Sequence, residues 1–167
     1  MAGTEESVAM PTPASRVRPY AATDRDAVLV LAPRLLIGLA PWIDKAATLT
    51  AAQGWITAVV EGTGSERAAF VADDGTGQVV GFVSVARQVH FSGQPRAYVG
   101  ELIIAAEAEG AGLGRLLLTA AEEWAIAQGL PVLELDTDTS NEHARHFYAH
   151  PGYAEEGIKL VKQLAKS

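Results

Sequence analysis

The spacing of apolar and polar residues changes from helical to strand-like in the middle of the chain. Between residues 68 and 105, three runs are rich in β-branched and aromatic side chains: AAFVA, VVGFVSVARQV and AYVGELIIA. The linker DDGTG after the first run suits a tight hairpin, because Asp-Gly tolerates left-handed backbone dihedrals, and FSGQPR supplies a second turn. The pattern therefore predicts a three-stranded antiparallel meander.

Helical spacing dominates on both sides of this meander. Leu113, Leu117 and Trp124 share one face of a predicted helix, and the sequence GLP that follows ends it. The segment 33–45, with two prolines and a glycine, predicts no regular element. We expect helices over 24–32, 44–61, 113–128 and 141–150, a first strand over 16–20 and two later strands over 131–136 and 157–164.

Length, charge and cysteine content limit the class of protein. The 167 residues are most simply one domain over 16–167, after a lead-in at 1–15 that we expect to be disordered and that lacks secretion-signal features. A net charge of -7 argues against a nucleic-acid partner and is compatible with cationic substrates. The longest apolar stretch, 27–43, is interrupted by Arg34 and two prolines, so no membrane span is expected. The absence of cysteine fits a reducing compartment, and we expect a cytoplasmic protein, with a homodimer left open.

Three glycines at alternate positions precede the helix predicted from 113. Gly110, Gly112 and Gly114 stand where free helix amides and the helix dipole can bind an anion, and glycine lets a phosphate approach the backbone. A helix-packing turn is an equal alternative from these residues alone. The dinucleotide fingerprint is excluded because its third glycine would fall on Arg115, and the Gly-Lys-Ser/Thr of a P-loop is absent.

Two motifs resemble a known family. Gly112, Leu113 and Gly114 match the end of the Gln/Arg-x-x-Gly-x-Gly/Ala motif of the GNAT superfamily of acetyl-CoA-dependent N-acetyltransferases. A later pattern of that superfamily is matched by Asn141, Ala144, Phe147, Tyr148, Gly152 and Tyr153. The resemblance covers 101–153 and implies an α/β (α+β) fold, with a mixed, mostly antiparallel central sheet splayed between its fourth and fifth strands and flanked by about four helices.

The resemblance also implies which residues bind acetyl-CoA, the expected co-substrate. The backbone of Leu102, Ile103 and Ile104 would pair with the pantetheine amides, and Asn141, a natural helix N-cap, would contact the pantetheine arm. The pyrophosphate would be held by the backbone amides of Gly110, Ala111, Gly112, Leu113, Gly114 and Arg115.

Glu109 departs from the motif, which has Gln or Arg at this place. A carboxylate about 6 Å from a pyrophosphate charge would cost on the order of 1–3 kcal/mol at an effective dielectric of about 20–40. Rotation into solvent would avoid most of that cost, and Arg115 is near enough in sequence to supply a compensating charge. If Glu109 points inward, Glu109→Gln should tighten acetyl-CoA binding.

Carboxylates and a tyrosine are the candidate catalytic groups. The resemblance places Tyr148 as the general acid that protonates the departing thiolate; the alternative is a buried core aromatic. It places Glu101 as a base for the amine; the alternative is a surface or salt-bridged glutamate. Asp136 is the substitute base or substrate anchor. Three histidines, at 143, 146 and 150, form a helical stripe, but we interpret them as structural or exposed, and no metal is expected.

The expected activity is transfer of the acetyl group of acetyl-CoA directly to a primary amine of a small molecule or peptide. The absence of cysteine favours direct transfer over an acyl-cysteine intermediate. The alternative is a non-catalytic acyl-CoA-binding module. In the family, the acceptor is set mainly by segments corresponding to 24–61 and 91–96, which do not reveal its identity here.

Overall fold

Five strands form one mixed sheet in the computed structural model, which describes residues 17–164. They follow one another across the sheet in chain order, and all neighbours are antiparallel except the last pair, which is parallel. The strands are β1 (Val17–Pro19), β2 (Arg67–Asp73), β3 (Val79–Val89), β4 (Pro95–Ile104) and β5 (Leu133–Leu135). The predicted meander is confirmed as β2, β3 and β4.

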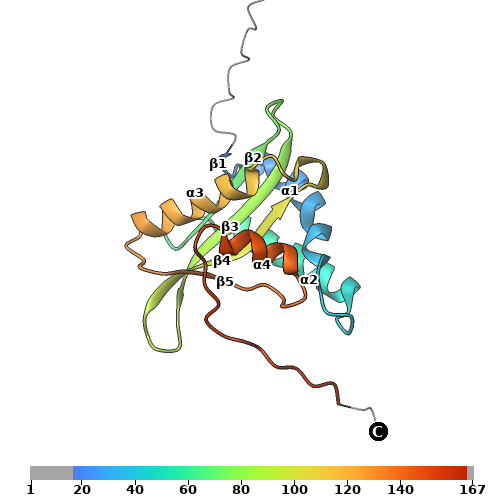
Figure 1. Cartoon of the computed structure of the whole chain (residues 1–167). Coiled ribbons are helices and arrows are strands. Elements are labelled where there is room, and N and C mark those ends of the chain that lie inside the picture. The colour runs from blue at the N-terminus through green and yellow to red at the C-terminus, as the bar shows by residue number, and fades with distance from the viewer. Residues whose placement is uncertain (1–16, 165–167) are drawn as a thin grey trace, which may run out of the picture.

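In the described part of the chain, four α-helices flank the sheet: α1 (Arg25–Leu31), α2 (Lys45–Glu61), α3 (Leu113–Ala127) and α4 (Glu142–Ala149). Short 3-10 turns, η1 (Ala22–Asp24), η2 (Ala32–Leu36) and η3 (Ala106–Ala108), connect them to their neighbours. Figure 1 shows α3 and α4 in front of the strands. The predicted fold class, a mixed and mostly antiparallel sheet with about four helices, is confirmed.

The core lies between the helices and the central strands. β3 is buried along most of its length, because α1 and α3 both contact it. Gly81 shows how close α3 lies, since a Cβ at this position would be 2.9 Å from Leu117 Cδ1. The largest fully buried side chains are Phe82, Ile56, Ile103, Leu117 and Leu118.

The sheet opens between β4 and β5. Their pairing begins at Ala97 with Leu133 and ends at Val99 with Leu135, whereas β4 continues to Ile104. A bulge follows the last paired residue, because Gly100 and Glu101 lie opposite the single residue Ser84 of β3. The last residues of β4 therefore have no strand on their β5 side, which is the splay that the resemblance implied.

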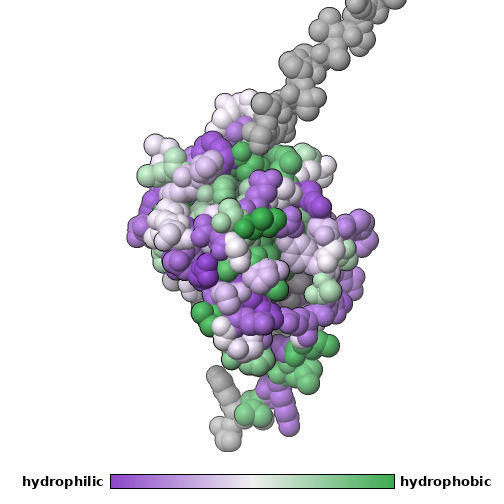
Figure 2. Space-filling model, turned by 90° about the vertical axis from the view of Figure 1, so that its left-hand side faces the viewer, coloured by the Kyte–Doolittle hydropathy of each residue, from purple (hydrophilic) through white to green (hydrophobic). Residues whose placement is uncertain are grey.

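The predicted strand at 157–164 is wrong. These residues form no strand, and Ile158 and Leu160 are 72% and 91% exposed. Figure 2 shows the C-terminal segment leaving the body of the protein with apolar and polar residues intermixed. The segment has strand-like composition, but a strand also requires a hydrogen-bonding neighbour, and β5 offers an edge of only three residues.

Several other boundaries differ from the predictions. The predicted helix at 24–32 begins as the 3-10 turn η1 and ends at Leu31, because Pro33 occupies the start of η2. The predicted strands at 16–20 and 131–136 shrink to three residues each. The lead-in at 1–15 lies outside the described residues. Within 17–164, no helix has the length and apolar character needed to cross a membrane.

Candidate active site

The glycine loop leaves a row of backbone amides free. Gly110 and Gly112 adopt φ angles of +77° and +78°, which favour glycine, and open space surrounds the Cβ position of each. Gly112 caps α3 without a side-chain hydrogen bond. In the described part of the chain, no amide from Gly110 to Arg115 donates a hydrogen bond to a protein group. The loop therefore presents up to six N–H donors at the positive end of a helix.

Gly114 has a different role from the other two glycines. A Cβ at this position would lie 3.4 Å from Phe147 Cζ and 3.7 Å from Ile104 Cγ1, so its small size lets α3 pack against α4 and the end of β4. Gly114 therefore serves helix packing, and the anion cradle stays a prediction for the free amides around Gly110 and Gly112.

The end of β4 exposes backbone groups beside this loop. Ala105 donates its N–H to Val80 O of β3, so by the alternation of strands Ile103 also faces β3. Leu102 and Ile104 then direct their backbone groups into the gap between β4 and β5. Leu102 and Ile104 therefore have backbone groups oriented to pair with pantetheine as expected, and Ile103 does not.

Glu109 forms an ion pair with Arg34 of η2. Arg34 Nη2 contacts Glu109 Oε1, and Arg34 Nε donates to Ile104 O at 3.2 Å. The expectation that Arg115 supplies the compensating charge is not met in this structure, because the partner comes from a segment 75 residues earlier in the chain.

Tyr148 lies on α4, whose start is fixed by Asn141. Asn141 Oδ1 accepts a hydrogen bond from Ala144 N at 3.1 Å, so the N-cap prediction is confirmed. Gly38, with φ +76°, packs closely against Asn141 and thereby joins the η2–α2 connection to the start of α4. Burial raises the pKa of the Tyr148 phenol to about 12, so this hydroxyl is protonated at neutral pH.

Tyr148 lines a groove of about 1550 Å³ that also includes residues of β4, β5 and the C-terminal segment. Tyr98 and Asp136 line it as well, and Tyr98 Oη donates to Asp136 Oδ2 at 3.2 Å. Burial, followed by the charge of Asp136, raises the pKa of Tyr98 to about 12. The structure therefore brings Tyr148 and Asp136 into one groove.

Glu101 occupies a different position and is not among the groove-lining residues. It is 6% exposed, and its carboxylate accepts a hydrogen bond from the Ser84 hydroxyl of β3. Burial raises the pKa of Glu101, and the Ser84 hydrogen bond opposes that shift. Glu101 is therefore a buried, hydrogen-bonded residue, and the alternative of a surface glutamate is wrong.

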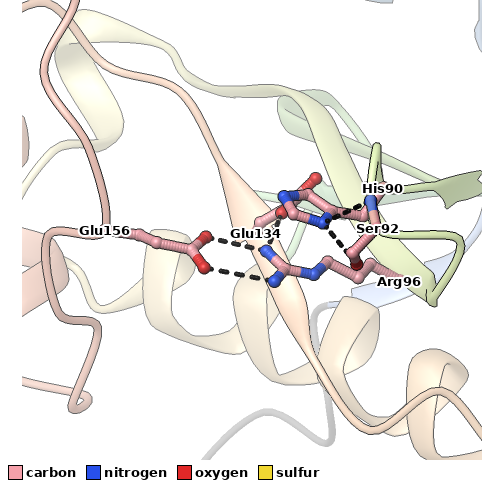
Figure 3. Close-up of polar contacts among 5 residues, drawn as sticks. All are labelled: His90, Ser92, Arg96, Glu134 and Glu156. Carbon is pink, nitrogen blue, oxygen red and sulfur yellow. Dashed lines mark hydrogen bonds and ion pairs between the residues drawn. The ribbon is translucent and has the colours of Figure 1, made fainter.

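The groove also contains a buried arginine that the sequence analysis did not identify. Arg96 Nη1 binds Glu134 of β5 at 2.7 Å and Glu156 of the C-terminal segment at 2.7 Å (Figure 3). The pKa of Glu156 is lowered, first by the hydrogen bond with Arg96 and then by its charge. Arg96 and Tyr98 are polar residues two positions apart on β4, and both line the groove. This alternation is the sequence signal that could have revealed the groove-facing side of β4.

Two histidines of the predicted stripe contact each other at the C-terminal end of α4. His146 and His150 stack edge to face with ring centroids 4.6 Å apart, and His150 Nδ1 lies 2.9 Å from the carbonyl oxygen of His146. Among residues 17–164, no group of three or more His, Asp or Glu side chains is arranged to hold a metal ion. His90, at the end of β3, contacts Ser92 in the adjacent turn, 2.8 Å from Nδ1 to Oγ (Figure 3).

Comparison with solved structures supports this fold. A putative acetyltransferase from Pyrococcus furiosus superposes with a TM-score of 0.72, at 20% identity over 89% of this chain and 98% of that one. The structure of AAC(6')-Iy in complex with the bisubstrate analogue CoA-S-monomethyl-acetylneamine gives a TM-score of 0.63, at 16% identity over 89% and 97% of the two chains. At these identities the likeness concerns the fold.

Sequence comparison gives the family. The chain is 32% identical over 91 residues to an aminoalkylphosphonate N-acetyltransferase of Salmonella typhimurium; the aligned region is 53% of this chain and 58% of that relative, less than two thirds of its length. The family model "Acetyltransferase (GNAT) family" matches residues 36–153. This match includes β2 to β5, the glycine loop and α4, and the chain belongs to the GNAT family of acetyltransferases.

Proposed function

We propose that this chain transfers the acetyl group of acetyl-CoA directly to a primary amine. The observation that carries the proposal is the row of free amides from Gly110 to Arg115 at the start of α3. Gly114 of this loop packs against Ile104, at the open end of β4, and against Phe147, the neighbour of Tyr148 on α4. Backbone N–H donors at a helix N-terminus match a pyrophosphate. The backbone groups of Leu102 and the N–H of Ile104 point into the gap and match amides of a pantetheine arm, while Ile104 O is bonded to Arg34. The donor set thus fits acetyl-CoA, which would supply an activated acetyl thioester.

The reaction forms a carbon–nitrogen and a sulfur–hydrogen bond, and it breaks a carbon–sulfur and a nitrogen–hydrogen bond. The amine nitrogen attacks the acetyl carbon, the carbon–sulfur bond breaks, and the sulfur leaves as a thiolate that needs a proton. Tyr148 is proposed to supply that proton, and its raised pKa keeps the phenol in the required protonated form near neutral pH. Its place on the groove wall supports this role.

Two carboxylates remain candidates for the group that takes the amine proton. Asp136 shares the groove with Tyr148 and is oriented by the Tyr98 hydroxyl. Glu101 lies at the β4 bulge, where burial moves its pKa toward the range of a general base, and it would act through water. A pH–rate profile separates them, because only loss of the true base should remove the acidic limb of kcat/KM.

The charge of the groove favours a cationic acceptor. Its carboxylates outnumber its lysine and arginine side chains, and Arg96 and Arg145 are paired with glutamates. Among residues 17–164, Glu122 and Asp136 form no ion pair, so the excess negative charge lies there. The relative from Salmonella typhimurium is named for aminoalkylphosphonates, so an anionic aminophosphonate belongs in any acceptor panel. We propose that amines without an added acidic group are better acceptors. The groove-lining acids are Glu122, Glu134, Asp136, Glu155 and Glu156.

An acceptor screen tests the proposal. Purified protein would be incubated with acetyl-CoA and single amines from four groups: polyamines, aminoglycosides, aminoalkylphosphonates and peptides with free N-termini. Release of CoA thiol that depends on the amine, together with an acetylated product in the mass spectrum, is the expected result. Binding of acetyl-CoA with no thiol release for any amine would instead support a non-catalytic acyl-CoA-binding module.

A further inference from the structure

Arg34 reaches the cofactor side of the fold from a distant part of the sequence. It lies in η2, directly after α1, and its guanidinium joins two elements of the candidate acetyl-CoA site. Nε donates to the carbonyl oxygen of Ile104, the last residue of β4, and Nη2 contacts the carboxylate of Glu109 beside the glycine loop. The side chain of Arg34 is 29% exposed, so part of it is accessible to solvent.

The contacts leave part of the guanidinium free. An arginine side chain carries five N–H donors in a planar fork, and the hydrogen bonds that Arg34 makes within residues 17–164 involve only Nε and Nη2. Nη1 has no hydrogen-bond partner among residues 17–164. Planar, paired N–H groups of this kind match phosphate oxygens.

Glu109 is a replaceable partner for this arginine. Its carboxylate side chain is 50% exposed, and ion pairs at exposed positions change an equilibrium by only a small factor. The bond to Ile104, by contrast, anchors the arginine at the strand end whatever happens at the loop. A diphosphate held by the free loop amides would present a stronger anion to the same guanidinium than one carboxylate does.

We propose that Arg34 is a phosphate-binding residue of the acetyl-CoA site and that Glu109 holds it in place when the site is empty. Arg34 exchanges Glu109 for the pyrophosphate when acetyl-CoA binds, while its bond to Ile104 persists. The cation that the loop motif lacks at position 109 is thus supplied from η2. This inference rests on the proposed function, because it requires that the glycine loop binds the pyrophosphate.

The test measures dissociation constants by calorimetry at one fixed ionic strength. Arg34→Gln should weaken acetyl-CoA binding by about tenfold to a hundredfold, as expected for a charge-assisted hydrogen bond, and Arg34→Lys should fall between it and the wild type. Glu109→Gln should tighten binding, because the competitor for Arg34 is lost. Arg25→Gln, which removes a cation paired only weakly with Asp26 on α1, is the matched control and should bind as the wild type does.

The double variant decides between direct binding and simple charge neutralisation. If Arg34 contacts the phosphate, Arg34→Gln/Glu109→Gln remains weak; if Arg34 only neutralises Glu109, the double variant regains wild-type affinity and the inference is wrong. Pantetheine, which has no pyrophosphate, should bind equally to wild type and Arg34→Gln. A melting temperature for each variant verifies that it is folded. Wild-type protein that binds no acetyl-CoA would overturn the proposed function itself, whereas unchanged binding by Arg34→Gln would overturn only the role of Arg34.

Discussion

Tyr148→Phe separates the proposed chemistry from binding and folding. The substitution removes a single hydroxyl that makes no hydrogen bond to another residue within 17–164, and the ring that contacts Phe147 and Tyr153 remains. Removal of that hydroxyl should therefore leave the free energy of unfolding and the acetyl-CoA dissociation constant nearly unchanged. The thiolate would lose its proton donor.

The size of the effect follows from general acid catalysis. A positioned acid contributes about 100-fold to 10 000-fold to a rate, so kcat of Tyr148→Phe should fall by that factor. This fall corresponds to a rise of about 3–5 kcal/mol in the activation free energy. The pKa of Tyr148, about 12, also predicts that ionisation of this phenol causes no loss of rate between pH 6 and 9. Steady-state thiol release with a saturating acceptor measures both quantities.

Tyr153→Phe is the matched control for this experiment. Tyr153 lines the same groove, but its hydroxyl donates to Glu122 Oε1 at 3.1 Å, so its loss should affect stability more than turnover. Full turnover by Tyr148→Phe, or an equal loss of kcat in both variants, would refute the assignment of Tyr148 as the acid.

Three further substitutions test the packing and electrostatics around the site. Glu101→Gln should change the pH dependence of unfolding. Burial raises the pKa of Glu101 in the folded protein above 4.5, so the wild-type free energy of unfolding falls as pH rises from 4.5 through that raised pKa. Urea titrations should show that this fall is absent in the variant. Gly81→Ala should cost about 1–3 kcal/mol by the same assay, because its new methyl group meets the buried Leu117; an unchanged midpoint would mean that α3 does not pack on β3 as described. Gly112→Ala should destabilise the protein by about 1–2 kcal/mol, because φ at this position is +78°, and should weaken acetyl-CoA binding, whereas the matched Gly157→Ala should do neither.

Local sequence signals predicted the parts of the fold that depend on neighbouring residues. The meander follows from strand-forming runs and two turns, and the start of α4 follows from the Asn141 cap. The position of the glycine loop was also predicted correctly, because closely spaced glycines directly before an amphipathic helix are visible in the local sequence. The splay between β4 and β5 came from the family resemblance.

Contacts between distant segments could not be predicted in this way. Nothing around Arg34 indicates that it meets Glu109, and Arg96 binds carboxylates 38 and 60 residues away. The error at 157–164 has a related cause, since apolar composition specifies a strand only where another strand is available to pair with it. The site's charge balance is therefore a property of the tertiary structure, while its backbone scaffold is visible in the sequence.

The central claim, that the glycine loop and the end of β4 form the acetyl-CoA site, is tested most directly by backbone amide NMR during a titration with acetyl-CoA. We expect the largest chemical-shift changes on the amides of Gly110–Arg115 and of Leu102 and Ile104. Pantetheine should change the shifts of the β4 amides and leave those of the loop amides unchanged. Saturable binding that leaves the Gly110–Arg115 amides unmoved, with the shifts located elsewhere on the protein, would contradict this claim.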